Sequence, residues 1–104
     1  MLSTNRDFQY IGELKIKESK YLKDNIKPKD DKLNWLMFEV NNRKYSFIYK
    51  IEKPGKAEYL IPFQIKIWFL MPEILKKKLT INKSYKVYRD MEYIGEVKII
   101  KEIT

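Results

Sequence analysis

The stretch YRDMEYIGEVKII, Tyr88–Ile100, alternates apolar and polar residues around a single glycine. A period of two is typical of a strand that buries one of its faces. It predicts that Tyr93 and Val97 share one face, whereas Ile94 lies on the opposite one. A glycine inside such a strand usually marks a bulge, or a corner where a second backbone comes close, because it has no side chain to bar the approach. Gly95 is therefore interpreted as a structural residue.

The residues that precede this glycine complete a hairpin. Tyr85 and Val87 lead a first strand toward a turn at residues 89–91, and the strand with the glycine follows. Strands joined by so short a turn are antiparallel. The sequence therefore predicts an antiparallel hairpin at this end of the chain.

A longer alternation occupies the middle of the sequence. From Tyr59 to Phe69 every second residue is aromatic or aliphatic, and polar residues or Pro62 fill most positions between them. This pattern predicts a long, half-buried strand over 59–69. Proline cannot donate to a ladder of hydrogen bonds, so Pro62 indicates a sheet edge or a bulge. Just before this strand, Pro54-Gly55 marks a turn, and Gly55 is interpreted as a structural residue.

Two further segments favour a second hairpin. Residues 33–40 and 44–51 are rich in aromatic and apolar side chains, and three residues separate them. Asn41 and Asn42 lie in this gap, and asparagine tolerates the positive φ that a tight hairpin needs. Both asparagines are therefore assigned a structural role in the turn. With one more strand predicted over 10–17, five or six strands are visible.

Two segments interrupt the strand pattern. Residues 18–32 are charged, contain Pro28 and have few apolar anchors, so they predict a mobile loop or a single helical turn. Residues 72–79 begin with proline and glutamate and carry lysines toward their end, an order that suits a short helical turn or loop. Strands without regular helical crossovers pair antiparallel. The sequence therefore predicts an all-β fold, a small antiparallel β-barrel of five to six strands.

Length and composition predict a single domain spanning residues 1–104. Hydrophobic residues make up 44% and charged residues 35% of the chain, which is typical of a folded protein rather than a disordered or membrane-embedded one. No apolar run resembles a signal peptide or reaches the ~18 residues of a spanning helix. We therefore expect a cytoplasmic protein that does not bind a membrane.

Residues 81–103, INKSYKVYRDMEYIGEVKIIKEI, also resemble part of a known family. An aromatic and an aliphatic residue, a turn, an aliphatic-glycine pair and a closing aliphatic strand follow in that order. This order is similar to the end of the third domain, the C-terminal β-barrel, of elongation factor Tu and related translation factors. The strands predicted over 8–16 and 59–69 are similar to earlier strands of that six-stranded barrel. The resemblance implies a stand-alone barrel of a kind that, in the translation factors, packs against other domains, a protein cofactor and tRNA.

Several features of that family are missing from this sequence. Family members usually carry glycine in the turn and a second glycine two residues after the first, where this chain has Asp90-Met91 and Val97. The chain also has no GxxxxGK[ST] phosphate loop, and 104 residues leave no room for a nucleotide-binding domain. We therefore expect neither a bound nucleotide nor GTP hydrolysis.

The residue types give no support to catalysis or metal binding. With no histidine and no cysteine, the chain lacks the base of a conventional catalytic triad and the usual ligands of zinc. Its carboxylates are scattered and fall in no recognisable motif, and Asp30-Asp31 is interpreted as a solvated loop pair. We therefore expect a non-catalytic protein without cofactor or metal.

The net charge of +8 and the many aromatic residues direct attention to binding. Lys76, Lys77 and Lys78 form the densest positive cluster, which suits a solvated turn as well as contact with RNA or an acidic protein. Trp68 lies opposite in parity to the face that its strand buries, so it is predicted to point outward. Together with Arg89, these residues are the candidates for partner binding.

Two classes of partner remain open. We favour a protein partner, of the kind that inhibitors, immunity proteins and adaptors bind, because arginine is the better tool for phosphate and base contacts and occurs only three times, as Arg6, Arg43 and Arg89. The alternative is an RNA or single-stranded nucleic-acid binder associated with translation, which would use lysines and outward aromatics. An oligomerising structural protein is a third possibility, and the oligomeric state stays open.

Overall fold

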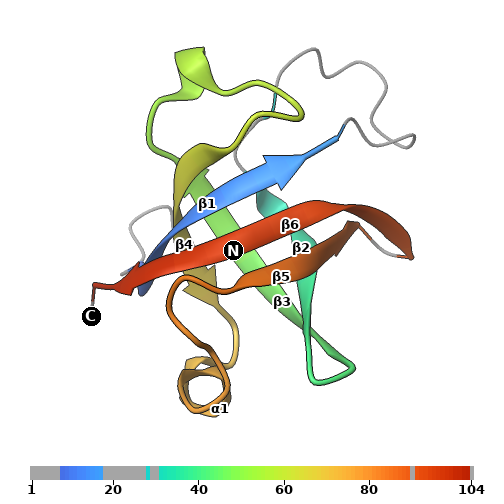
Figure 1. Cartoon of the computed structure of the whole chain (residues 1–104), viewed down its shortest axis with the longest axis vertical. Helices are drawn as coiled ribbons and strands as arrows, with labels where there is room; N and C mark the ends of the chain where they lie inside the picture. The colour runs from blue at the N-terminus through green and yellow to red at the C-terminus, as the bar shows by residue number, and fades with distance from the viewer. Residues whose placement is uncertain (1–7, 18–27, 29–30, 90, 104) are drawn as a thin grey trace.

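The computed structural model describes residues 8–17, 28, 31–89 and 91–103 of the chain. In this described part, six strands pair antiparallel into one closed barrel, in the order β1-β4-β3-β2-β5-β6 (Figure 1). The strands are β1 (Tyr10–Ile16), β2 (Asp31–Val40), β3 (Arg43–Ile51), β4 (Phe63–Phe69), β5 (Ser84–Arg89) and β6 (Glu92–Glu102). The predicted all-β antiparallel barrel is confirmed, with the larger of the two expected numbers of strands.

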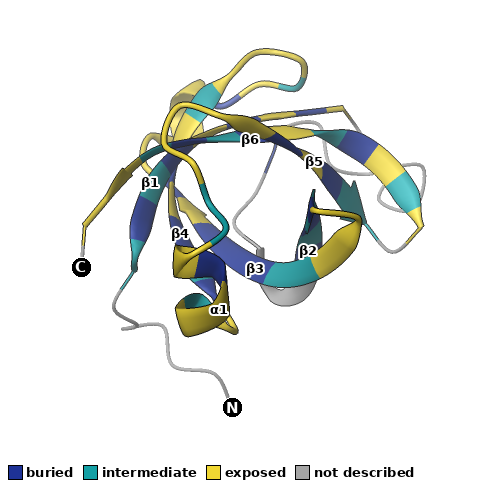
Figure 2. Cartoon of the chain, turned by 60° about the horizontal axis from the view of Figure 1, so that its bottom comes forward, coloured by how far each residue is buried: buried dark blue, intermediate teal, exposed yellow. Residues whose placement is uncertain are grey.

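Aromatic side chains fill the centre of the barrel. The ring centroid of Phe38 lies 5.0 Å from that of Phe69, 5.9 Å from that of Phe47 and 6.0 Å from that of Tyr85. These four residues come from four different strands, so their tilted and edge-on contacts tie β2, β3, β4 and β5 together. Figure 2 shows buried and exposed residues following one another along the strands. The two-residue period of the sequence is therefore the alternation between the barrel interior and the outer surface.

The β2–β3 hairpin turns at Asn41 and Asn42. Their φ angles are 51° and 65°, the left-handed values that asparagine tolerates better than most residues. Val40 pairs directly with Arg43, so the turn has two residues and β3 begins one residue earlier than predicted.

The strand predicted over 59–69 is shorter in the structure, because β4 begins only at Phe63. Leu60 has a φ of 68°, which an extended strand does not allow, and its N–H donates to the Ile16 carbonyl oxygen over 2.9 Å. Pro62 follows and has no N–H to offer to a neighbouring strand. As a result Leu60 and Ile61 are 65% and 53% exposed, although the alternation predicted that Ile61 lies on the buried face.

Gly95 stands where β6 closes the barrel against β1. It pairs with Ile16 in the strand register. A Cβ placed on Gly95 would overlap the Lys15 carbonyl oxygen and lie 2.8 Å from the Ile16 Cα. No side chain fits there, and the constraint is one of space rather than of φ, because no described glycine has a positive φ.

Next to this glycine a β-bulge changes which side chains face inward. Val87 pairs with Gly95 and Tyr88 pairs with Tyr93, so Ile94 is one extra residue on β6. Ile94 is buried, at 3% exposure, and Tyr93 is 47% exposed. The strict alternation that placed Tyr93 on the same face as Val97 is therefore wrong, because the bulge shifts the parity by one residue.

The irregular segments differ in part from the predictions. The loop predicted over 18–32 lies largely outside the described residues, and at its end Asp31 and Lys32 already belong to β2. Within the stretch predicted as a helical turn, helix α1 covers only Pro72–Lys76 and buries Leu75 against the barrel. Among the described residues, no helix has the length and apolar character needed to cross a membrane.

The turn expected at Pro54-Gly55 is the 3-10 helix η1 (Pro54–Lys56). Gly55 has no positive φ, and nothing lies within 4 Å of the position that a Cβ would take. The predicted turn is present, but neither a positive φ nor a close contact requires a glycine at position 55.

Candidate binding surfaces

Three exposed apolar residues lie close together in the sequence between the end of β4 and the first turn of α1. Leu70, Met71 and Ile74 are 55%, 47% and 41% exposed, whereas Leu75 beside them is fully buried. Met71 is the N-cap of α1 (Pro72–Lys76), and Ile74 lies in its first turn, so both exposed side chains stand where the helix begins. We call Leu70, Met71 and Ile74, with the neighbouring Lys76 and Lys77, the α1 surface.

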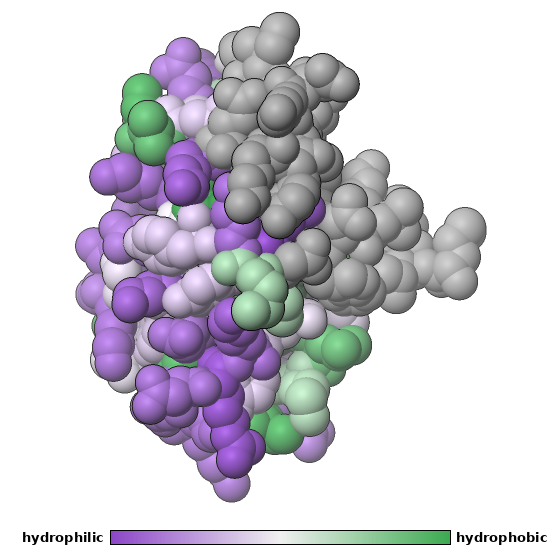
Figure 3. Space-filling model, turned by 90° about the vertical axis from the view of Figure 1, so that its right-hand side faces the viewer, coloured by the Kyte–Doolittle hydropathy of each residue, from purple (hydrophilic) through white to green (hydrophobic). Residues whose placement is uncertain are grey.

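Other exposed apolar residues occur on the described surface, among them Leu60 at 65% and Ile61 at 53%. On the side that Figure 3 shows, hydrophilic residues cover most of the described surface, and hydrophobic residues form small separate groups among them. An apolar run anchored by a buried neighbour is held in a fixed position, as a contact surface for another protein requires.

The three lysines of the predicted positive cluster have different surroundings. Lys76 lies 3.6 Å from a Glu102 carboxylate oxygen, but both side chains are solvent-accessible, so this ion pair contributes little to stability. Lys77 is exposed. The ammonium group of the half-buried Lys78 donates to the Tyr45 hydroxyl oxygen over 2.9 Å. This hydrogen bond lowers the pKa of Tyr45, against the opposing effect of desolvation.

A shallow depression of about 270 Å³ separates α1 from the end of the barrel. It is lined by Gln9, Tyr10, Pro72, Glu73, Lys76 and Glu102. Burial raises the pKa of Tyr10, and the charge of the neighbouring Glu102 and a hydrogen bond to it raise it further. The lining mixes two carboxylates with one ammonium group, so it does not select strongly for an anion or a cation.

A second surface lies on the outer side of β3 and β4. Trp68 is half-buried and does not belong to the core cluster, although Ile67 and Phe69 on either side of it do. Opposite Trp68 stands Ile48, which is 3% exposed and is also outside that cluster. The outward direction predicted for Trp68 therefore agrees with its place in the strand.

Lysines stand directly opposite one another on the same side. Lys50 pairs with Lys66 across β3 and β4, Lys66 pairs with Ile11 of β1, and Ile11 pairs with Lys101 of β6. All three lysines are exposed, and within the described residues none of them forms an ion pair. Like charges opposite each other in a sheet are destabilising. We call Lys50, Lys66, Lys101 and Trp68 the β3–β4 face.

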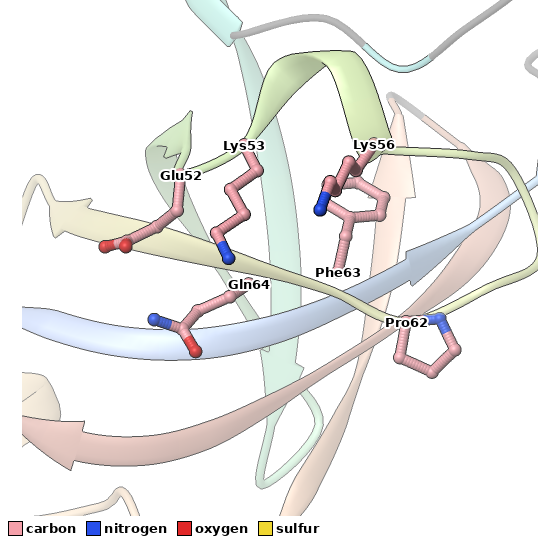
Figure 4. A pocket seen from close by; sticks show the side chains of 6 residues that line it. All are labelled: Glu52, Lys53, Lys56, Pro62, Phe63 and Gln64. Carbon is pink, nitrogen blue, oxygen red and sulfur yellow. The ribbon is translucent and has the colours of Figure 1, made fainter.

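At the far end of β4 from α1, a pocket of about 290 Å³ lies beside η1 (Figure 4). We call it the η1 pocket, and its lining residues are Glu52, Lys53, Lys56, Pro62, Phe63 and Gln64. Glu52 and Gln64 are joined through their backbones by a hydrogen bond of 3.1 Å, so the pocket continues the β3–β4 sheet. Gln64, Lys66 and Trp68 occupy alternate positions of β4 and connect the pocket to the β3–β4 face.

The structure does not bring the five residues proposed for partner binding into one site. Arg89 lies at the last position of β5, at the opposite end of that strand from the segment that follows α1. It is half-buried, and its Nε is buried without a hydrogen-bond partner among the described residues. Arg89 is therefore separate from Lys76, Lys77 and Lys78.

The sequence reasoning missed the lysines that the barrel places side by side. Lys50 and Lys66 are sixteen residues apart in the sequence, and only the register between β3 and β4 makes them neighbours. Lys53 and Lys56 could have been noticed from their position next to the predicted turn, but nothing local placed Phe63 beside them.

Within the described ranges, no group of three Asp, Glu, His or Cys side chains could hold a metal ion.

In comparisons with the models of known protein families and with curated proteins, nothing matches this chain.

Proposed function

We propose that this chain is a non-catalytic binding module whose α1 surface docks on an acidic protein. The observation that carries this proposal is the run of exposed apolar side chains, Leu70, Met71 and Ile74, on a turn anchored by the buried Leu75. Burial of such side chains against a partner supplies the favourable energy of association. The partner would be the target of an inhibitor, the toxin of an immunity protein or a protein bound by an adaptor.

Charge supports an acidic partner. Lys76 and Lys77 follow the apolar residues and are exposed, while the acidic residues near them are Glu73 in the same helix and Glu102, 3.6 Å from Lys76. Lysines beside an apolar contact steer an acidic surface toward it and raise the rate of association. Because the apolar centre holds the complex, binding should tolerate salt better than a purely electrostatic contact would.

The test compares two doubly substituted variants with the wild type as bait in a native lysate treated with nuclease. The α1 variant is Met71→Asp with Ile74→Asp. The matched control is Leu60→Asp with Ile61→Asp, which changes two residues of similar or greater exposure at the other end of β4. We expect an acidic protein that the wild type and the control retain at high salt and that the α1 variant binds about 30-fold more weakly or worse.

Two results would contradict the proposal. Equal retention of the same protein by all three baits would show that the α1 surface is not the contact. Loss of every retained protein after nuclease treatment would show that nucleic acid bridged them.

A second candidate function is the binding of single-stranded nucleic acid by the β3–β4 face. The observation that favours it is the set of exposed lysines, Lys50, Lys66 and Lys101, which form no ion pair among the described residues and lie on the same side as the half-buried Trp68. A polyanion would remove the repulsion between the opposed lysines, and an aromatic ring beside them offers a base something to stack on. This function predicts an affinity that falls steeply with salt.

A further inference from the structure

We infer that the η1 pocket holds one nucleotide of a single strand, with the phosphate between Lys53 and Lys56 and the base against Phe63. This inference rests on the second candidate function and adds a defined subsite to it. It is independent of the α1 surface, which lies beyond the other end of β4.

Two lysines, Lys53 and Lys56, line the η1 pocket. Lys53 precedes the η1 turn and Lys56 is its last residue, and in Figure 4 both side chains extend from η1 toward β4. Two positive charges in one region repel each other, so an anion between them is stabilised by both. The Gln64 amide lies below them and can both donate and accept hydrogen bonds. The Glu52 carboxylate also lines the pocket, but in Figure 4 it points away from the two ammonium groups.

Phe63 supplies a flat apolar wall beside these charges. It is the first residue of β4, it pairs with Leu14 of β1, and its half-buried ring packs against the core. The ring is therefore held in place by the barrel rather than by a flexible loop. Stacking on a fixed aromatic ring is tolerant of sequence, because every base has a π-face.

The pocket is large enough to hold part of one nucleotide. Its volume of about 290 Å³ is at the lower end of the roughly 300–1,000 Å³ of pockets that enclose whole small molecules. It can take a phosphate and part of a base, while the rest of the ligand must lie on the open surface. That surface is the outer side of β4.

Continuity with the β3–β4 face favours a polymer over a single phosphorylated side chain. Gln64, Lys66 and Trp68 are spaced by two residues each, about 6.6 Å along a strand. A chain that leaves the pocket therefore meets the opposed pair of Lys50 and Lys66 and then the ring of Trp68. Repeated phosphates can use these successive charges, whereas one phosphorylated residue cannot.

The test measures the affinity of a fluorescent oligouridine of about ten nucleotides by anisotropy, from about 20 to 200 mM salt. The pocket variant is Lys53→Gln with Lys56→Gln. The control is Lys83→Gln with Lys86→Gln, which removes the same charge from exposed lysines that do not line the pocket. A third protein, Phe63→Leu, removes the ring but keeps an apolar side chain, and thermal melting checks that each variant is folded.

We expect the pocket variant to bind about tenfold more weakly than the control variant and to lower the slope of log K against log salt by about 0.7, the value for one neutralised phosphate on a single strand. Phe63→Leu should weaken binding by about fivefold or more with an unchanged slope, because a stacking contact carries no charge.

The possible failures separate the subsite from the function on which it rests. If the oligouridine binds the wild type and the two lysine variants weaken it equally, the subsite is wrong while nucleic-acid binding stands. If the wild type does not bind oligouridine even at the lowest salt, the subsite and the second candidate function both fail. Tighter binding of a phosphoserine peptide than of oligouridine would also overturn the inference.

Discussion

Gly95 faces Ile16 across the β1–β6 pair so closely that a Cβ on the glycine would lie 2.8 Å from the Ile16 Cα. Two backbones therefore meet at this point with no side chain between them, and β6 completes the barrel against β1. A β-bulge lies next to this glycine, and its extra residue, Ile94, is buried in the core.

The first prediction concerns this close approach. Gly95→Ala should lower the free energy of unfolding by about 3 kcal/mol or more, because backbone atoms of β1 must move to admit the methyl group. Urea denaturation followed by circular dichroism measures the change. Gly55→Ala is the matched control, since its Cβ meets nothing within 4 Å, and it should be neutral or stabilise by about 0.5 kcal/mol. Similar effects of both substitutions would contradict this explanation of Gly95.

The second prediction concerns a buried hydroxyl that holds the loop after α1. The Tyr85 hydroxyl oxygen accepts a hydrogen bond of 2.8 Å from the Thr80 N–H, and Tyr85 itself is 4% exposed. Tyr85→Phe should destabilise the protein by about 1 kcal/mol and leave the Thr80 amide without this partner. Hydrogen exchange should become faster at Thr80. Tyr93→Phe, at a ring that is 47% exposed, should change stability by less than about 0.5 kcal/mol.

The third prediction concerns the ionisation of Tyr45. Because Lys78 donates a hydrogen bond to its hydroxyl oxygen, the pKa of Tyr45 is lowered from that of a free tyrosine. The unfolded chain then keeps this proton to higher pH than the folded one, so the contribution of Tyr45 to the free energy of unfolding rises with pH between the folded and unfolded pKa values. At neutral pH the ionisation of Tyr45 does not contribute to the free energy of unfolding.

Ring-carbon NMR of labelled tyrosine follows this titration directly. Lys78→Met should raise the pKa of Tyr45 toward the ordinary value, whereas Lys76→Met should leave it where it is. Tyr10 gives an internal contrast, because burial and Glu102 raise its pKa. Its stabilising contribution is complete below a pH of about 10 and is lost as the pH rises through its folded pKa. A Tyr45 resonance that titrates together with that of Tyr10 would show that the Lys78 contact is absent.

The fourth prediction is that removing the repulsion between Lys50 and Lys66 stabilises the fold but weakens the binding of nucleic acid. Lys50→Glu turns the repulsive pair with Lys66 into an attractive one, so the free energy of unfolding should rise by about 0.5 kcal/mol. Binding of oligouridine, if the β3–β4 face is used, should fall. The mirror control is Lys15→Glu, which places a carboxylate opposite Glu96 and should destabilise by a similar amount. A loss of stability in Lys50→Glu would show that the two lysines do not repel each other.

Much of the fold could be predicted from the residue pattern. Alternation showed the strands, Asn41 and Asn42 marked the turn that takes positive φ, and the glycine in the final strand marked a close approach. These features are local, because side-chain parity and φ preference depend on a residue and its immediate neighbours. The predictions of side-chain direction were wrong where contacts with a neighbouring strand changed the local backbone. Leu60 is held in a turn by the Ile16 carbonyl, and the bulge at Ile94 reverses the expected parity.

The candidate surfaces depended on the tertiary structure to a greater degree. The sequence by itself determined that the chain is basic, that lysines cluster at 76–78 and that Trp68 lies opposite in parity to the buried face. Only the barrel decided that Lys50 faces Lys66 and that Lys53 and Lys56 share a pocket with Phe63. It also separated Arg89 from the other candidates. The physical reason is that alternation reports which side of a strand a residue takes, whereas register and strand order decide which residues become neighbours, and these follow from closure of the whole sheet.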